Sequence, residues 1–475
     1  MPQSGQPTQK QDLPFDGSLA SFYAQKTLEE FTLSPDRHEW MKLLLFDHLA
    51  VTVGGANLDS SRVARNAFRT SSDRTDQSVD ARCRLFGTEK VATAEAAAMV
   101  NGITAHGLEL DDTFEAASHH PGVVIFPAVF ATGEDNDSTM QELLEAATVG
   151  YDVMCHAGLM LGAADSYGRG FHPTGVAGAL GATAAICRLK MLSTDVTSVA
   201  LGLAANLASG SLEFLSDGSW TKRLNAGNAA KVGITSVRLA EAGFTSPALA
   251  LEGRDGFLSN FGTGLHTSRF VNWEPGEFAW STSIKLYPCC RYMHGNIDLL
   301  LELTSEYPDL NADKIEKIEL AVIEAGSRLV SVPRDAKMTV ESQVDAQFNM
   351  FFGGALALTR GSVNVDDFEN AADMVRSLKP VMEKIECVTD PDIEASYPDD
   401  WAARVTLTFA DGTSMTKTTQ AFKGSPGRPV TQDDLLKKAS GLIGSEAALS
   451  LLKTVTQCDT ASVRSFVSEI PVSEK

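Results

Sequence analysis

The stretch TGVAGALGATAAICRLK, residues 174–190, decides the fold class of this chain. It is rich in alanine and glycine, and four of its small residues recur at helical spacing: Gly175, Gly178, Ala179 and Ala182. Such a face lets a second helix approach closely. It is not a phosphate-binding loop, because the P-loop spacing with its lysine is missing. The stretch therefore predicts a helix packed against other helices.

Helical patterns extend around this stretch, from about residue 18 to 270. Ser34-Pro35-Asp36 is a start signal, with Ser34 as N-cap and proline in the first turn. We expect that helix to end at Gly54-Gly55. Residues 91–107 are alanine-rich, and residues 139–163 continue the same pattern. This part of the chain predicts a large all-helical domain.

The pattern changes after about residue 275. Residues 318–322 and 405–409 alternate as strands do, and Asp411-Gly412 is a hairpin signal before Ser414–Thr418. Helices are expected between the strands, over His294–Tyr307, Asp345–Leu358 and Asp366–Leu378. The region from 280 to 420 therefore predicts a smaller α+β domain.

The 475 residues exceed one ordinary core, so we expect two domains in a mainly α fold. Residues 1–17 are predicted to be a disordered tail. Thr431-Gln-Asp-Asp434 is an entry signal for a last helical section, which should pack back on the first domain. The predicted domains are therefore 18–279 with 421–475, which is helical, and 280–420, which is α+β.

Composition limits the partners and the compartment. The net charge of -21 and the pI near 4.8 disfavour nucleic acid and anionic membranes as partners. The N-terminal residues 1–18 have no apolar core of a secretory signal, and no apolar run reaches the length of a membrane span. Seven cysteines are scattered without a C-x-x-C motif. We therefore expect a reduced, cytoplasmic protein.

Histidines in two loops are the first candidates for proton transfer. His119-His120 precede Pro121-Gly122 and so lie in a turn, where a histidine is a better acid–base candidate than in a core. Only one of this pair should point inward. His172 precedes Pro173 at a predicted helix start, where free N–H groups attract a carboxylate. A solvent-facing loop histidine is the alternative at this position.

An acidic cluster, Glu109, Asp111 and Asp112, precedes Thr113 and the histidine pair. Its spacing matches no zinc or EF-hand pattern, so we expect no metal. One alternative is a capping cluster that orders the loop. The functional interpretation is that one of these carboxylates orients a histidine and raises its basicity.

Lys222, Lys285 and Arg291 are the candidate anion ligands. Lys285 lies between apolar residues, and such a lysine is either a snorkelling surface residue or a buried ligand for an anion. Cys289-Cys290 lie beside these cations, but a buried inert thiol is the commoner case. No G-x-S-x-G and no G-x-G-x-x-G after a strand is present, so neither a serine nucleophile nor a dinucleotide cofactor is predicted.

Taken in order, these segments resemble the MmgE/PrpD family, which contains 2-methylcitrate dehydratases, cis-aconitate decarboxylases and iminodisuccinate epimerases. The resemblance covers about residues 20 to 460. Its landmarks are His106-Gly-Leu-Glu-Leu-Asp-Asp-Thr113, His120-Pro-Gly, Gly170-Phe-His172-Pro, Thr221-Lys222 with Gly227-Asn-Ala-Ala-Lys231, Lys285-Leu-Tyr-Pro and Asp345-Ala-Gln-Phe348.

The resemblance implies a large helical domain, a smaller α+β lid domain, a homodimer, and an active site between domains without metal or cofactor. With the residue analysis above, it leads to these predicted site residues: His120, His119, His172, Asp111 and Glu109 as catalytic, and Thr113, Lys222, Lys285 and Arg291 as substrate-binding. The family motif can be aligned on either histidine of the pair, and we choose His120.

The resemblance further implies a cofactor-independent lyase that acts on a small di- or tricarboxylate through a carbanion or enediolate. Decarboxylation of the cis-aconitate type is the first choice. Dehydration of the 2-methylcitrate type is weakened, because Ser118-His-His-Pro-Gly-Val stands where those dehydratases resemble W-G-H-P-S-D-N. Lys285-Leu-Tyr-Pro-Cys-Cys290 resembles fungal decarboxylases and also the epimerases. A non-catalytic homologue that binds a polycarboxylate is the alternative from another class.

Overall fold

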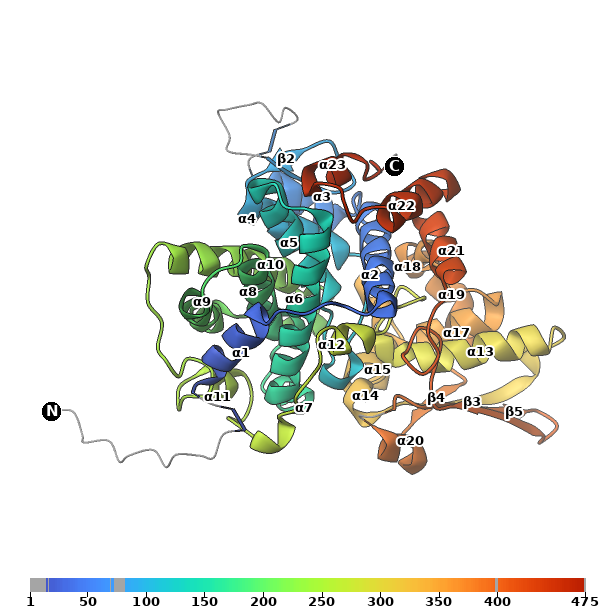
Figure 1. The fold of residues 1–475 in the computed structure, drawn as a ribbon. Coiled ribbons are helices and arrows are strands. Elements are labelled where there is room, and N and C mark those ends of the chain that lie inside the picture. Colours follow the sequence, from blue (N-terminus) through green and yellow to red (C-terminus); the bar gives the residue numbers. More distant parts are fainter. Residues whose placement is uncertain (1–13, 16, 69, 72–81, 398–399, 474–475) are drawn as a thin grey trace.

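The computed structural model describes residues 14–15, 17–68, 70–71, 82–397 and 400–473. The tail predicted over residues 1–17 lies almost entirely outside them. The described chain is mainly helical with a small mixed sheet (Figure 1), which confirms the predicted fold class.

Helix α8 (Pro173–Leu189) is the centre of the helical part, and every one of its residues is buried. It packs against α5 (Gly122–Asn136), α6 (Met140–Leu161), α9 (Thr194–Leu207) and α10 (Thr221–Glu241). A Cβ added at Gly181 would lie 2.5 Å from Met154 Cβ on α6, so only glycine permits this approach. The predicted close-packed helix is therefore confirmed.

Helix α2 (Pro35–Gly54) begins and ends where the sequence predicts. The Ser34 hydroxyl accepts a hydrogen bond from the Arg37 N–H at 3.4 Å, and Gly55 is the C-cap. The helical part also contains short strands and further helices, of which α4 and α12 contact α2: α1 (Leu19–Leu28), α3 (Asp59–Asn66), β1 (Cys83–Arg84), β2 (Val91–Ala92), α4 (Ala94–Ala105), α7 (Ala163–Gly168), α11 (Phe257–Phe261) and α12 (Glu277–Trp280).

The α+β part contains a sheet of order β4-β3-β5-β6. Its strands are β3 (Ile315–Ala321), β4 (Ile385–Val388), β5 (Ala403–Phe409) and β6 (Ser414–Thr419). Strand β4 pairs in parallel with β3, and the other neighbours are antiparallel. The predicted hairpin at Asp411-Gly412 joins β5 to β6. Strand β4 was not predicted, because four residues are too few to show a period.

Further helices belong to this part: α13 (His294–Glu306), α14 (Glu324–Val330), α15 (Arg334–Lys337), α16 (Gln343–Gln347), α17 (Met350–Arg360), α18 (Val365–Glu369), α19 (Ala371–Met382) and α20 (Pro391–Ser396). Among them α13 and α17 pack against the sheet, and two of the predicted helices are each divided in two. The single helix predicted over Asp345–Leu358 is wrong. Asn349 interrupts it, since its side chain accepts from the Phe352 N–H at 3.0 Å and caps a new helix. Likewise, Asn370 separates α18 from α19.

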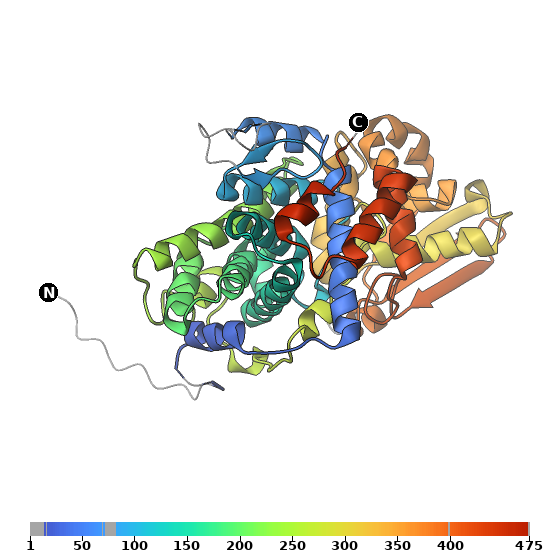
Figure 2. The same ribbon diagram turned by 45° about the horizontal axis from the view of Figure 1, so that its top comes forward.

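The last helices, α21 (Gln432–Ile443), α22 (Ser445–Thr456) and α23 (Val463–Ser468), return to the helical part. Figures 1 and 2 both show α21 and α22 beside α2. One hydrophobic core joins buried residues from 19–284 with residues 430–470, and a second joins residues 289–422 with Phe214. The domain limits at residues 280 and 420 remain predictions.

Two further observations concern the cysteines and the apolar segments. All seven cysteines are free thiols, and all but Cys387 are buried. Among the described residues, none of the helices combines the length and the apolar character needed to cross a membrane.

Candidate active site

A small cavity lies between the two hydrophobic cores. Its walls come from two parts of the chain: Glu109, Thr113, Ser118, His120, Tyr167, His172, Leu212, Phe214 and Lys222 from the first, and Cys290, Arg291, Tyr292, Leu329, Phe348 and Trp401 from the second. The cavity volume is about 30 Å³, room for one or two water molecules.

Three helix starts point their polar groups at this cavity. His120 lies just before α5, His172 is the N-cap of α8, and Lys222 is the second residue of α10. Helix N-termini carry unpaired N–H groups and the positive end of the helix dipole. The positive ends of the α8 and α10 dipoles therefore favour an anion near His172 and Lys222.

Glu109 is the anionic centre of the site. It adopts a left-handed backbone conformation with φ 55°, unusual for a residue other than glycine. Its Oε1 accepts from Lys222 Nζ and, at 2.9 Å, from Lys285 Nζ. Burial opposes ionisation, but the two lysines outweigh it and hold the pKa of Glu109 well below its ordinary value. Glu109 is thus an ionised carboxylate that is shared by both lysines.

The two lysines differ in their access to the cavity. Lys222 lines it, and its ammonium also lies 5.0 Å from the centre of the Phe348 ring. Lys285 is fully buried behind Glu109 and donates to the Glu109 carbonyl at 3.3 Å. Burial lowers the pKa of Lys222, whereas Glu109 and Asp111 overcome burial and raise the pKa of Lys285. Lys285 therefore acts on the site through Glu109.

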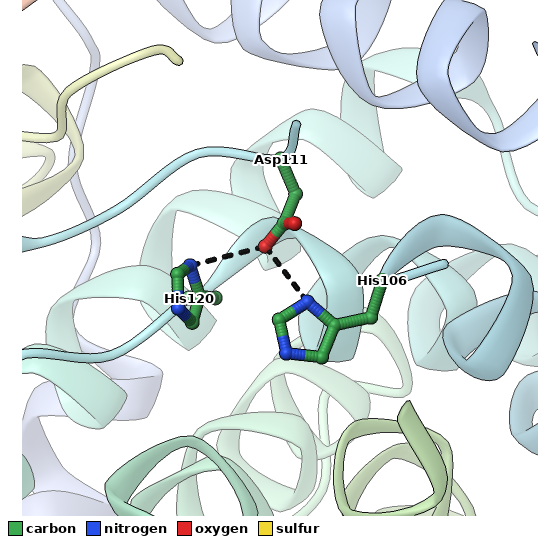
Figure 3. A group of neighbouring side chains, drawn as sticks. All are labelled: His106, Asp111 and His120. Atoms are coloured by element: carbon green, nitrogen blue, oxygen red, sulfur yellow. Dashed lines mark hydrogen bonds and ion pairs between the residues drawn. The ribbon is translucent and has the colours of Figure 1, made fainter. Parts of the chain in front are cut away.

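Asp111 holds two imidazoles, as Figure 3 shows. Its Oδ2 lies 3.1 Å from His106 Nδ1 and 3.1 Å from His120 Nδ1. His120 Nδ1 also lies 2.8 Å from the Asp112 carbonyl oxygen. Because a carbonyl oxygen only accepts, His120 Nδ1 must carry a proton. In the neutral ring Nε2 then keeps its lone pair and is free to act as a base.

His172 has the opposite tautomer. The Asn225 amide nitrogen donates to the Ser211 carbonyl at 3.1 Å and lies 3.4 Å from His172 Nδ1. Nδ1 therefore accepts, and the proton of the neutral ring is on Nε2. The ring also stacks on His106, with centroids 6.0 Å apart. Burial lowers the pKa of His120 to about 4 and that of His172 well below its ordinary value, so both rings are neutral at pH 7.

His106, Asp111 and His120 offer ligand atoms within 4.8 Å of one another, which could in principle suit a metal ion. The hydrogen bonds favour a different role. A metal on His120 Nδ1 would remove the proton that satisfies the Asp112 carbonyl, and Lys285 Nζ already lies 4.0 Å from Asp111 Oδ1. We therefore treat the group as a carboxylate that orients two imidazoles.

His119 is turned away from the cavity. It is fully buried, and its Nε2 lies 3.5 Å from Cys155 Sγ. Its backbone pairs with Phe114 on both sides, with N···O distances of 2.8 and 3.3 Å, and its ring lies against the Phe114 ring. Because adjacent side chains of an extended backbone point to opposite sides, this pairing directs His120 toward the cavity.

Arg291 and Cys290 border the cavity from the α+β part, and Cys289 is the buried neighbour of Cys290. Arg291 Nε donates to Glu115 Oε1 at 2.8 Å, and its guanidinium lies 4.4 Å from the centre of the Phe422 ring. Burial raises the pKa of Cys289 and of Cys290, so both remain thiols rather than nucleophilic thiolates.

The Asp112 carboxylate accepts hydrogen bonds from the Gly122 N–H at 2.9 Å and from the Tyr151 hydroxyl at 2.6 Å.

Sequence reasoning missed several residues that the structure brings to the site. His106 begins the family motif and lies five residues before Asp111, so its position in that motif was an available signal. Phe348 closes the Asp345-Ala-Gln-Phe348 motif, which was also an available signal. Tyr167 and Trp401 carried no signal, since each resembles an ordinary aromatic core residue.

The buried histidines predict strong acid sensitivity. Burial lowers the pKa of seven imidazoles: those of His48, His106, His119, His120, His156, His172 and His294. A folded pKa below the unfolded one means that the unfolded chain binds more protons. Each imidazole therefore removes up to ~1.4 kcal/mol of stability per pH unit as pH falls below about 6.5. Asp112 and Asp152, whose pKa burial raises to about 7, act in the opposite direction and offset two of the seven.

Urea unfolding at several pH values measures this effect. We expect the free energy of unfolding to fall by several kcal/mol between about pH 6.5 and pH 5, above the range in which most carboxylates protonate. A free energy of unfolding that stays level over this range would contradict the assignment of neutral, buried imidazoles.

Comparison with known proteins covers most of the chain. The pattern of the MmgE/PrpD N-terminal domain matches residues 17–268, and that of the MmgE/PrpD C-terminal domain matches residues 287–450. The chain is 28% identical over 448 residues to the cis-aconitate decarboxylase-like protein oryM of Aspergillus oryzae, covering 89% of this chain and 90% of that protein.

Two further relatives carry the name cis-aconitate decarboxylase. The protein of Aspergillus terreus is 27% identical over 78% of this chain and 79% of its own length. The protein of Mus musculus is 26% identical over 76% of this chain and 75% of its own length.

Proposed function

This chain belongs to the MmgE/PrpD family. We propose that it is a lyase acting on a small di- or tricarboxylate through a carbanion or enediolate. Among the possible reactions, cis-aconitate-type decarboxylation is our first choice. One observation carries the proposal. Lys222, His172 and the free Nε2 of His120 border one cavity at three helix starts. The names of the relatives favour decarboxylation.

Substrate carboxylates would be held by donors of different kinds. Lys222 provides the ammonium, His172 provides Nε2–H, and the Thr113 hydroxyl lies at the same wall. Arg291 would meet a second carboxylate from the opposite wall. Lys285 contributes indirectly, by sharing Glu109 with Lys222 and so leaving Lys222 less strongly neutralised. Such donors are worth most in a site that excludes water.

Decarboxylation needs a proton at the end of the reaction. When the C–C bond to the leaving carboxylate breaks, its electron pair stays on the substrate and delocalises over the double bond toward a remaining carboxylate. Carbon dioxide leaves, and His120, which takes up a proton from solvent at Nε2 when the anionic substrate binds, gives that proton to the carbanion. The bound anion raises the proton affinity of His120, and Asp111 at Nδ1 stabilises the imidazolium.

Dehydration is the second candidate, and the tautomers favour it. His120 Nε2 bears a lone pair in the neutral site and could remove an α-proton, while His172 Nε2–H could assist departure of the hydroxyl group. The same two rings on opposite faces of a substrate would serve an epimerase. A non-catalytic polycarboxylate-binding homologue remains the alternative from another class, and a homodimer remains the expected assembly.

One experiment separates these functions. The protein is incubated in D2O with cis-aconitate, 2-methylcitrate, citrate and iminodisuccinate, and each is followed by proton NMR. We expect cis-aconitate to lose carbon dioxide and gain one deuteron at carbon. Dehydration would give an alkene from a citrate instead, and epimerisation would give exchange at an unchanged skeleton.

A chelator control belongs to the same experiment. Because the hydrogen bonds of His106, Asp111 and His120 favour a metal-free role, we expect turnover to survive dialysis against EDTA. If none of the four compounds gives a product or shows deuterium exchange, the result contradicts the proposed function.

A further inference from the structure

The turn that carries Glu109 is held by distant side chains. Three consecutive carbonyls accept hydrogen bonds: that of Leu108 from Gln347 Nε2 at 3.0 Å, that of Glu109 from Lys285 Nζ at 3.3 Å, and that of Leu110 from Lys438 Nζ at 2.8 Å. The left-handed conformation of Glu109 is unfavourable for a residue with a Cβ, so its surroundings must impose it. Side-chain donors on successive carbonyls can do so.

Lys438 is further from the cavity than Lys285 is. Lys285 also bonds to Glu109 Oε1, and Glu109 lines the cavity, whereas Leu110 and Asp47, the partners of Lys438, lie outside the cavity lining. Lys438 projects from α21, and its Nζ forms an ion pair with Asp47 Oδ1 on α2 at 2.6 Å. The side chains of Lys438 and Asp47 are only 5% and 3% exposed. A buried ion pair often adds little to the stability of a protein, since apolar residues of similar size in its place often give an equally stable fold. We therefore look for a role of the Lys438–Asp47 pair other than stability.

We infer that Lys438 is a positioning residue, whose bond to the Leu110 carbonyl fixes the turn that presents Glu109 and Asp111. These two carboxylates flank Leu110, and they set the positions of Lys222 and His120 respectively. Asp47 keeps the Lys438 ammonium directed at the carbonyl. The expected effect on turnover rests on the proposed function. The expected effect on the conformation of the turn does not, and it can be tested in a protein of any function.

The double variant Asp47→Leu/Lys438→Met is the central test. It replaces the ion pair by apolar side chains, a change often neutral for stability, and removes the donor to the Leu110 carbonyl. We expect kcat to fall about 10- to 100-fold with KM changed by less than about threefold, because misplaced groups cost mainly the chemical step. Hydrogen exchange measured by mass spectrometry should become faster in residues 106–113, with the thermal midpoint near that of the unaltered protein.

The chain offers a matched control in Lys42, a buried lysine of α2. Lys42 Nζ lies 2.8 Å from Asp459 Oδ2 and 3.2 Å from the Thr456 carbonyl, so it also joins a carboxylate to a backbone oxygen. None of these residues lines the cavity. We expect Lys42→Met/Asp459→Asn to leave kcat and the exchange of residues 106–113 unchanged.

The outcomes are distinct. If the double variant keeps its kcat and its exchange in residues 106–113, the inference is overturned. It is also overturned if the double variant exchanges faster throughout the chain and the Lys42 control loses as much kcat as the double variant does. If the unaltered protein converts none of the four carboxylates, the proposed function fails, and the exchange data alone decide the role of Lys438. Should the double variant not fold, Asp47→Asn/Lys438→Gln, which shortens the donor but keeps the side chains polar, provides the same exchange comparison.

Discussion

Replacing His120 by glutamine should lower turnover by about 10²- to 10⁴-fold, the usual contribution of a proton-transfer residue. Glutamine can still donate to the Asp112 carbonyl that now accepts from His120 Nδ1 at 2.8 Å, so the loop should remain folded. It cannot carry a proton to or from carbon. Initial rates at saturating substrate, with the thermal midpoint measured on the same sample, give the result.

Two further histidine variants make this prediction sharp. His156→Gln is the matched control for a buried imidazole, since His156 bonds to the Tyr23 hydroxyl at 2.8 Å and does not line the cavity. His119→Gln tests the choice within the histidine pair. We expect it to keep most of its turnover, because the His119 ring faces Cys155. Turnover of His120→Gln within about threefold of the unaltered protein would remove His120 from the mechanism.

Replacing Lys285 by methionine should damage both stability and activity. Lys285 is fully buried and lies 2.9 Å from Glu109 Oε1 and 4.0 Å from Asp111 Oδ1. Removing one partner of a buried ion pair leaves an uncompensated charge and typically costs about 3–5 kcal/mol. We expect a loss of that size in urea unfolding, together with a loss of turnover, since Glu109 would then draw Lys222 more strongly away from substrate.

A second substitution separates the two effects of Lys285→Met. Lys285→Met/Glu109→Gln removes the excess buried charge, so it should recover much of the lost stability without recovering turnover. Lys190→Met, which breaks a more exposed ion pair with Glu241 at 2.6 Å, is the control and should leave both quantities unchanged. If Lys285→Met unfolds at the same urea concentration as the unaltered protein, the buried charge triad of Glu109, Lys222 and Lys285 is not a structural unit.

Much of the fold could be predicted because it depends on local patterns. The N-cap at Ser34, the small-residue face of 174–190 and the Asp411-Gly412 turn each act over a few residues, and each is found where the sequence predicts. The errors also have local causes. Asn349 and Asn370 begin new helical segments inside stretches whose apolar period is continuous.

Lys285 shows where sequence reasoning stops for the candidate site. Its apolar neighbours allow either a snorkelling surface lysine or a buried anion ligand. The choice depends on Glu109, which lies 176 positions away. In the same way, nothing local distinguishes His119 from His120. Pairing of the backbone with Phe114 determines which ring faces the cavity.

The amino-acid sequence by itself determined most of the helical and strand segments, the family and the kinds of chemical group available, because periodicity, capping and motif order are properties of neighbouring residues. Only the tertiary structure decided that His120 keeps a free Nε2 while His172 presents an N–H, and that Glu109 is shared by two lysines. The physical reason is that tautomers and charge neutralisation are set by hydrogen-bond partners, and folding brings those partners together from distant parts of the chain.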